Sequence, residues 1–100
     1  MDRGDFTVLK QTAISDPKEM GRIHALWACA QMAREGRGSL QGLMILMKHG
    51  NPEIRAHMCR ILGETDAEYA VEQLIKALDD ESPRVRLQAA LALHRLASEE

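Results

Sequence analysis

The sequence repeats itself at an interval of about 31 residues, and this spacing limits the available folds more than any other feature. The segment NPEIRAHMCRIL at 51–62 aligns with SPRVRLQAALAL at 82–93, an offset of 31. Both copies open with a polar residue and a proline, followed by Ile or Val and then Arg. A looser copy, GRIHALWAC at 21–29, aligns with IRAHMCRIL at 54–62, an offset of 33. Offsets of this size in a chain of 100 residues predict about three units.

Each of the two closer copies has the features of a helix start. Asn51 and Ser82 suit the N-cap position, and Pro52 and Pro83 then occupy the first helical position, where a missing N–H costs nothing. The dipeptide Asp-Pro at 16–17 repeats this signal. Beyond the caps, apolar residues recur at the spacing of one helix face. They are Ile54, Met58, Ile61 and Leu62 in one copy, and Val85, Ala89, Ala92, Leu93 and Leu96 in the other.

Three further helices are predicted, over residues 6–14, 40–48 and 67–78. The helix at 67–78 has one apolar stripe, formed by Ala67, Ala70, Val71, Leu74, Ile75 and Leu78. The helix at 40–48 is apolar around most of its circumference, which predicts a central position between neighbours. Its apolar residues are Leu40, Leu43, Met44, Ile45, Leu46 and Met47. The short connections between the helices predict antiparallel neighbours.

The runs DDESPRVRLQAALAL and GNPEIRAHMCRILG resemble HEAT repeats, particularly the HEAT-like repeats of phycobilisome lyases. The resemblance covers residues 38–97 well and residues 5–35 less closely. It implies an all-α protein, an α-α superhelix in the form of a short HEAT/armadillo-like solenoid of about six helices. We expect a single domain over 1–100, with repeat units at approximately 5–35, 38–63 and 66–98.

The resemblance also implies a structural role for one arginine in each unit, namely Arg22, Arg55 and Arg86. Each would brace the loop before its helix, because a planar guanidinium can make several hydrogen bonds at once. We expect Arg86 to bond Asp79 or Asp80, and Arg55 to bond Asn51. A ladder of anion-binding arginines is the alternative.

Composition and motifs favour no catalytic chemistry. The net charge is −2, so the chain has no overall field that attracts nucleic acid or acidic lipid. The longest uncharged apolar-rich stretch, at 39–47, is too short to cross a bilayer. Neither paired carboxylates, a Ser-His-Asp series nor a phosphate-binding loop can be assembled. We therefore expect no enzyme activity, no cofactor, no nucleic acid and no membrane partner.

Two histidines and two cysteines require separate consideration. His24 and His57 occupy equivalent positions in two repeats, but the third repeat has Gln88 there. Neighbouring helices in a stack lie ~8–10 Å apart, whereas all ligands of a zinc ion must lie within ~2.1 Å of it. We expect no metal site. Cys29 and Cys59 form no C-x-x-C motif and lie away from helix starts, where thiolates are stabilised. They are predicted to be buried packing residues in a reducing cytoplasm.

A second set of apolar positions lies off the predicted core faces. In the last helix these are Leu87 and Leu91, and in the first unit they are Ile23, Leu26, Trp27 and Ala30. Either neighbouring helices or the further repeats of a longer array cover them, or they form a contact surface, since solenoid ends normally have polar caps. Our candidate partner-binding residues are Ile23, Trp27, Arg60, Leu87 and Leu91.

These features predict a cytoplasmic, non-catalytic scaffold module that binds another protein by rigid shape complementarity. Two alternatives remain open. The first is a subunit of a bilin lyase-like system of the phycobilisome type, which rests on fold resemblance alone. The second is a purely structural homo-oligomer that associates through the apolar surface of a terminal repeat.

Overall fold

The structure, a computed structural model, describes residues 3–64 and 68–98, which form helices joined by short turns and loops. No strand occurs within these ranges, so the all-α prediction is confirmed. The elements are α1 (Arg3–Ser15), α2 (Glu19–Arg34), the 3₁₀ helix η1 (Gln41–Lys48), α3 (Pro52–Leu62), α4 (Glu68–Ala77) and α5 (Pro83–Ser98). None of these helices is long and apolar enough to cross a membrane.

The chain divides into two compact units, Met1–Leu46 and Met47–Glu100. The single domain and the repeat boundaries expected from the sequence stay predictions. The start of the third expected unit, at 66–67, lies outside the described residues, as does Ala67 of the predicted apolar stripe.

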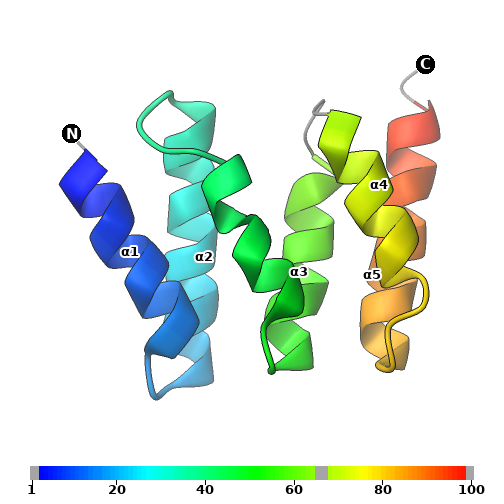
Figure 1. The fold of residues 1–100 in the computed structure, drawn as a ribbon, viewed down its shortest axis with the longest axis horizontal. Coiled ribbons are helices and arrows are strands. Elements are labelled where there is room, and N and C mark those ends of the chain that lie inside the picture. The colour runs from blue at the N-terminus through cyan, green and yellow to red at the C-terminus, as the bar shows by residue number, and fades with distance from the viewer. Residues whose placement is uncertain (1–2, 65–67, 99–100) are drawn as a thin grey trace. The chain divides into compact units, whose positions relative to one another are not determined.

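The first unit is built around the hairpin of α1 and α2, which run side by side in opposite directions (Figure 1). Phe6 and Ala13 of α1 are buried, as are Ala25 and Cys29 of α2. The Phe6 ring lies so close to Gly38 that a Cβ at that position would overlap it. Gly38 therefore allows the loop after α2 to close over α1.

The start of α2 differs from the prediction. The sequence placed Pro17 at the first helical position, but α2 begins at Glu19 with Lys18 as its N-cap residue. The Asp16 carboxylate instead accepts a hydrogen bond from the Lys18 backbone N–H at 2.7 Å. Asp16 and Pro17 therefore belong to a turn that precedes the helix.

The second unit consists of α3, α4 and α5, with α5 contacting both of the others. Asn51 caps α3 as predicted, because its Oδ1 accepts from the Glu53 N–H at 2.8 Å and Pro52 follows at the first helical position. The core of this unit is apolar and well buried. It includes Ile54, Met58, Leu62, Leu74, Val85 and Ala89.

The segment 40–48 differs from the predicted all-round buried α-helix. It forms a 3₁₀ helix in which Leu43 and Leu46 are buried, Met44 and Met47 are half-buried, and Ile45 is 63% exposed. A 3₁₀ helix has three residues per turn, so positions three apart share one side. Only the side of Leu43 and Leu46 is therefore buried.

The apolar stripe predicted for α4 is only partly buried. Ala70 and Leu74 are fully covered, whereas Val71, Ile75 and Leu78 are exposed. Two of the five described residues of the stripe therefore join the core, and the other three lie at the surface.

Candidate protein-binding surface

Three arginines, one in each predicted repeat, hold the loop that precedes their own helix in the same way. In each case Nη1 donates a hydrogen bond to the backbone carbonyl six residues earlier. The pairs are Arg22 with Asp16 at 2.5 Å, Arg55 with His49 at 2.6 Å, and Arg86 with Asp80 at 2.7 Å. The spacing of six is the same in all three, so the loops share one local geometry.

The side chain of the same loop residue also accepts a hydrogen bond from the backbone two residues later. Asp16 accepts from Lys18 at 2.7 Å, His49 Nδ1 from Asn51 at 3.0 Å, and Asp80 from Ser82 at 2.9 Å. The sequence did not reveal this common feature, because an imidazole stands in one loop and carboxylates in the other two. Each loop is therefore held at one residue, whose backbone carbonyl accepts from the arginine and whose side chain accepts from the backbone N–H two residues later.

Arg55 extends this arrangement from its own loop to the next one. It was expected to bond Asn51, but its Nε and Nη2 instead donate to Oδ2 and Oδ1 of Asp80, at 2.9 and 3.0 Å. The two side chains are 11% and 14% exposed. Hydrogen bonding to the guanidinium, aided by the Ser82 N–H, lowers the pKa of Asp80. Asp79, the other carboxylate considered, lies exposed.

The lowered pKa of Asp80 predicts a loss of stability in acid. The carboxyl has a pKa of about 3.9 in the unfolded chain and a lower pKa in the folded protein. The ion pair therefore contributes fully to the free energy of unfolding above about pH 3.9. Its contribution disappears as the pH falls through the folded pKa. We expect Asp80→Asn to reduce stability at neutral pH and to flatten its decline below about pH 5. Urea unfolding over a pH series measures this, and an unchanged acid slope would contradict the assignment.

The helices α3 and α5 lie in register, as two further ion pairs show. Glu53 pairs with Arg84 at 2.6 Å and Glu64 with Arg95 at 3.6 Å, each across an offset of 31. Both pairs are more exposed than the Arg55–Asp80 pair. The sequence repeat is therefore reproduced as a repeat in space within this unit.

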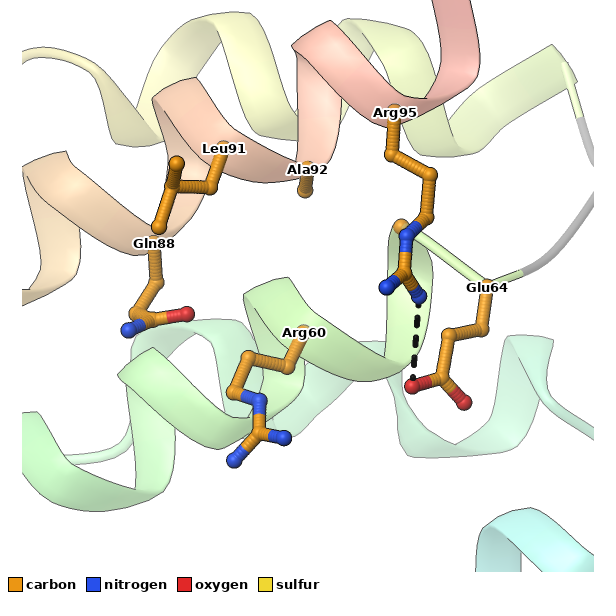
Figure 2. A pocket seen from close by; sticks show the side chains of 7 residues that line it. Arg60, Glu64, Gln88, Leu91, Ala92 and Arg95 are labelled. Atoms are coloured by element: carbon orange, nitrogen blue, oxygen red, sulfur yellow. Dashed lines mark ion pairs between the residues drawn. The ribbon is translucent and has the colours of Figure 1, made fainter. Parts of the chain in front are cut away.

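A shallow cleft of about 180 Å³ opens between α3 and α5, which we call the α3/α5 cleft. In Figure 2 Arg60 projects from α3, while Leu91 and Arg95 come from α5. Arg95 turns towards Glu64, its ion-pair partner. The full lining is Arg60, Gly63, Glu64, Gln88, Leu91, Ala92 and Arg95.

The repeated geometry of the second unit agrees with a comparison of the sequence with protein families. A family model described as HEAT repeats matches residues 40–100. The chain belongs to the HEAT repeat family. The resemblance to HEAT repeats is thereby confirmed, whereas the particular likeness to the repeats of phycobilisome lyases stays a prediction. A search of curated proteins and a search of solved structures each return no match.

The candidate contact residues of this HEAT-repeat chain fall into different places. Arg60 and Leu91 both line the α3/α5 cleft, and Leu91 is 53% exposed. Leu87 is 54% exposed on α5 but does not line that cleft. The structure thus brings two of the five candidates together.

The second apolar set on α2, for which cover by neighbours and a contact surface were both considered, is largely covered. Leu26 and Ala30 are buried, and Ile23 and Trp27 are half-buried. Ala25 and Cys29, on another side of the same helix, are buried too. The apolar residues of α2 are therefore covered on more than one side, and a contact role for Ile23 and Trp27 stays a prediction.

The cysteines of the HEAT-repeat chain lie in its interior. Cys29 and Cys59 are both buried free thiols. Burial raises the pKa of each to about 11, and the nearby Asp80 carboxylate adds to the effect at Cys59. At neutral pH both are therefore protonated and poorly nucleophilic. In residues 3–64 and 68–98 no group of three His, Cys, Asp or Glu side chains is placed to hold a metal ion.

Proposed function

We propose that this chain is a non-catalytic interaction module that binds another protein through the α3/α5 cleft. HEAT repeats generally act as scaffolds for protein interaction, which supports the first part of the proposal. The position of Arg60 and Leu91 in one cleft supports the second. This juxtaposition is the observation that carries the proposal.

The chemistry of the cleft favours a partner segment with both acidic and apolar side chains. Arg60 and Arg95 supply two guanidinium groups, and arginine is frequent among the residues that dominate binding energy. Leu91 supplies an exposed apolar contact in the same cleft. The Arg95–Glu64 pair is long and solvent-exposed, so little energy opposes its exchange for a partner carboxylate.

We also propose a cytoplasmic location. Cys29 and Cys59 are both unpaired thiols, and such thiols persist in reducing compartments.

Two single substitutions test the cleft. Arg60→Glu reverses a guanidinium charge, and Leu91→Asp removes the apolar contact at an exposed position that the fold tolerates. We expect each to weaken binding of a partner by about tenfold or more, equivalent to about 1.4 kcal/mol. The partner is first isolated by cross-linking and mass spectrometry with the unaltered chain. Its affinity for each purified variant is then measured by calorimetry.

Lys76→Glu is the matched control. It makes the same charge reversal on α4, at an exposed lysine that does not line the cleft. Binding should be retained in this variant, and circular dichroism should show all three variants folded. A partner that binds Arg60→Glu and Leu91→Asp as tightly as the control would refute the cleft as its site.

A further inference from the structure

We infer that the chain associates head to tail with further copies of itself, with Arg86 of one copy binding Asp16 of the next. This interaction uses surfaces outside the α3/α5 cleft and goes beyond the function proposed above. The inference rests on the chain's own Arg55–Asp80 pair, which shows how one repeat holds its successor.

The Arg55–Asp80 pair joins two successive loops. Nη1 of Arg55 binds the carbonyl of its own loop at His49, while Nε and Nη2 bind the Asp80 carboxylate in the loop before α5. The arginine thus uses one edge of its guanidinium locally and offers the other to the following repeat. The same device can join any two repeats that present an arginine and an aspartate at these positions.

Arg86 is the counterpart of Arg55, 31 residues later, at the exposed side of α5. Its Nη1 binds the Asp80 carbonyl, which reproduces the local half of the arrangement. Within residues 3–64 and 68–98, no hydrogen bond is shown from its Nε or Nη2. The donors that Arg55 directs to the next loop are therefore available on Arg86.

The apolar residues beside Arg86 are also uncovered. Leu87 corresponds to Ala56 of α3, yet Leu87 is 54% exposed while Ala56 is 1% exposed. Ala90 corresponds to Cys59, and it too is exposed where its counterpart is buried. We call the surface formed by Arg86, Leu87, Ala90 and His94 the tail face.

Asp16 is the counterpart of Asp80, 64 residues earlier, because the offsets of 33 and 31 between successive repeats add up to 64. Its carbonyl accepts from Arg22 and its carboxylate from the Lys18 N–H, as Asp80 does with Arg86 and Ser82. A Cβ added at Gly21 would lie 2.8 Å from the Asp16 Cγ and Oδ1. The carboxylate therefore lies over the first turn of α2, where glycine leaves room for it.

The same offset locates the side of α2 that corresponds to the α3-facing side of α5. Four α5 residues mark the side of α5 that faces α3. Arg84 and Arg95 pair with glutamates, Gln88 lines the cleft, and Ala92 lies against Gly63. Their counterparts on α2 are Met20, Gln31, His24 and Ala28, all exposed or half-buried. We call these four residues together with Asp16 the head face.

The two faces are compatible in charge and in apolar character. The tail face presents Arg86 as its guanidinium, and the head face presents Asp16 as its carboxylate. Leu87 on the tail face and Met20, which is 62% exposed on the head face, provide apolar surface. His94 stands at the position of Gly63, so two copies cannot approach there as closely as α3 approaches α5. The contact should therefore concentrate around Arg86, Leu87 and Asp16.

A contact between two different faces does not close on itself as a symmetric dimer does. Such a contact builds an open row or a closed ring of copies, and in either case the average mass should rise with concentration above that of a single copy. High salt should weaken the association, because screening reduces attraction between exposed charges.

Charge exchange at the two positions tests the inference. Arg86→Glu leaves a carboxylate on both faces, and Asp16→Lys leaves a cation on both. We expect each variant alone to lose self-association by about tenfold or more, measured as average mass by sedimentation equilibrium over a concentration series. An equimolar mixture of the two variants pairs opposite charges at every junction, so it should regain the rising mass of the unaltered chain.

The mixture distinguishes a lost contact from a damaged loop, because loop damage cannot be repaired by mixing. Lys76→Glu, a charge reversal away from both faces, should associate like the unaltered chain. The inference is overturned if the unaltered chain stays monomeric at millimolar concentration, or if the mixture fails to recover. Loss of association with Arg86→Glu but not with Asp16→Lys would also overturn it, since it would indicate a tail-to-tail dimer.

Discussion

Replacing Arg55 with leucine is expected to lower the free energy of unfolding by about 3 kcal/mol, the scale of removing one partner from a largely buried ion pair. The substitution leaves the Asp80 carboxylate, only 14% exposed, without its guanidinium. It also removes the donor to the His49 carbonyl. Urea unfolding at neutral pH, followed by circular dichroism, measures the loss.

The neighbouring pair of Arg84 and Glu53 supplies the control. Its side chains are 51% and 30% exposed, so Arg84→Leu should change stability by less than about 1 kcal/mol. The double variant Arg55→Leu/Asp80→Leu should recover part of the single-variant loss, because no unpaired charge remains. Equal effects of Arg55→Leu and Arg84→Leu would show that the buried pair does not hold the two loops together.

The helices could be predicted from the sequence wherever local signals determine them. The start of α3 is encoded by Asn51 and Pro52, which are adjacent, and the Asn51 cap forms as expected. The apolar face of α3 also follows from spacing alone, since Ile54, Met58 and Ile61 all lie on one buried side. These properties depend on residues within one or two turns of each other.

The loop contacts could not be predicted in this way. Arg55 and Asp80 are 25 residues apart, and their pairing depends on how α3 lies against α5. The expectation that Arg55 would bond Asn51 followed from the HEAT resemblance, which places the arginine against the loop before its own helix. Arg55 does bond that loop, at the His49 carbonyl, but the rest of its guanidinium reaches Asp80 in the next loop. The recurrence of an arginine in each repeat nevertheless identified the residues that make the contact.

The segment 40–48 shows the same limit for backbone conformation. By composition, its apolar residues fit a buried α-helix. The chain instead forms the 3₁₀ helix η1 there and leaves Ile45 exposed. The hydrophobicity of a segment predicts how much apolar surface it has. How many of its sides are buried depends on the packing of the whole unit.

Replacing Gly63 with alanine is expected to lower the free energy of unfolding by about 2 kcal/mol. A Cβ at this position would lie 2.7 Å from the Ala92 Cβ and 3.0 Å from the Ala92 Cα. Gly63 has φ −67° and ψ −13°, a conformation open to any residue, so the cost is steric and not conformational. The backbone of α5 must move to admit the methyl group, because the Ala92 Cα cannot rotate away.

Gly50→Ala is the matched control, since nothing lies within 4 Å of an added Cβ there and its φ is not positive. It should leave stability unchanged or raise it by up to about 1 kcal/mol through the unfolded chain. Ala92→Gly, combined with Gly63→Ala, should remove the Cβ clash and show coupling in a double-variant cycle of urea unfolding. Additive effects of the two substitutions would mean that α3 and α5 do not meet at these residues, and that the spatial repeat inferred from their register is incorrect.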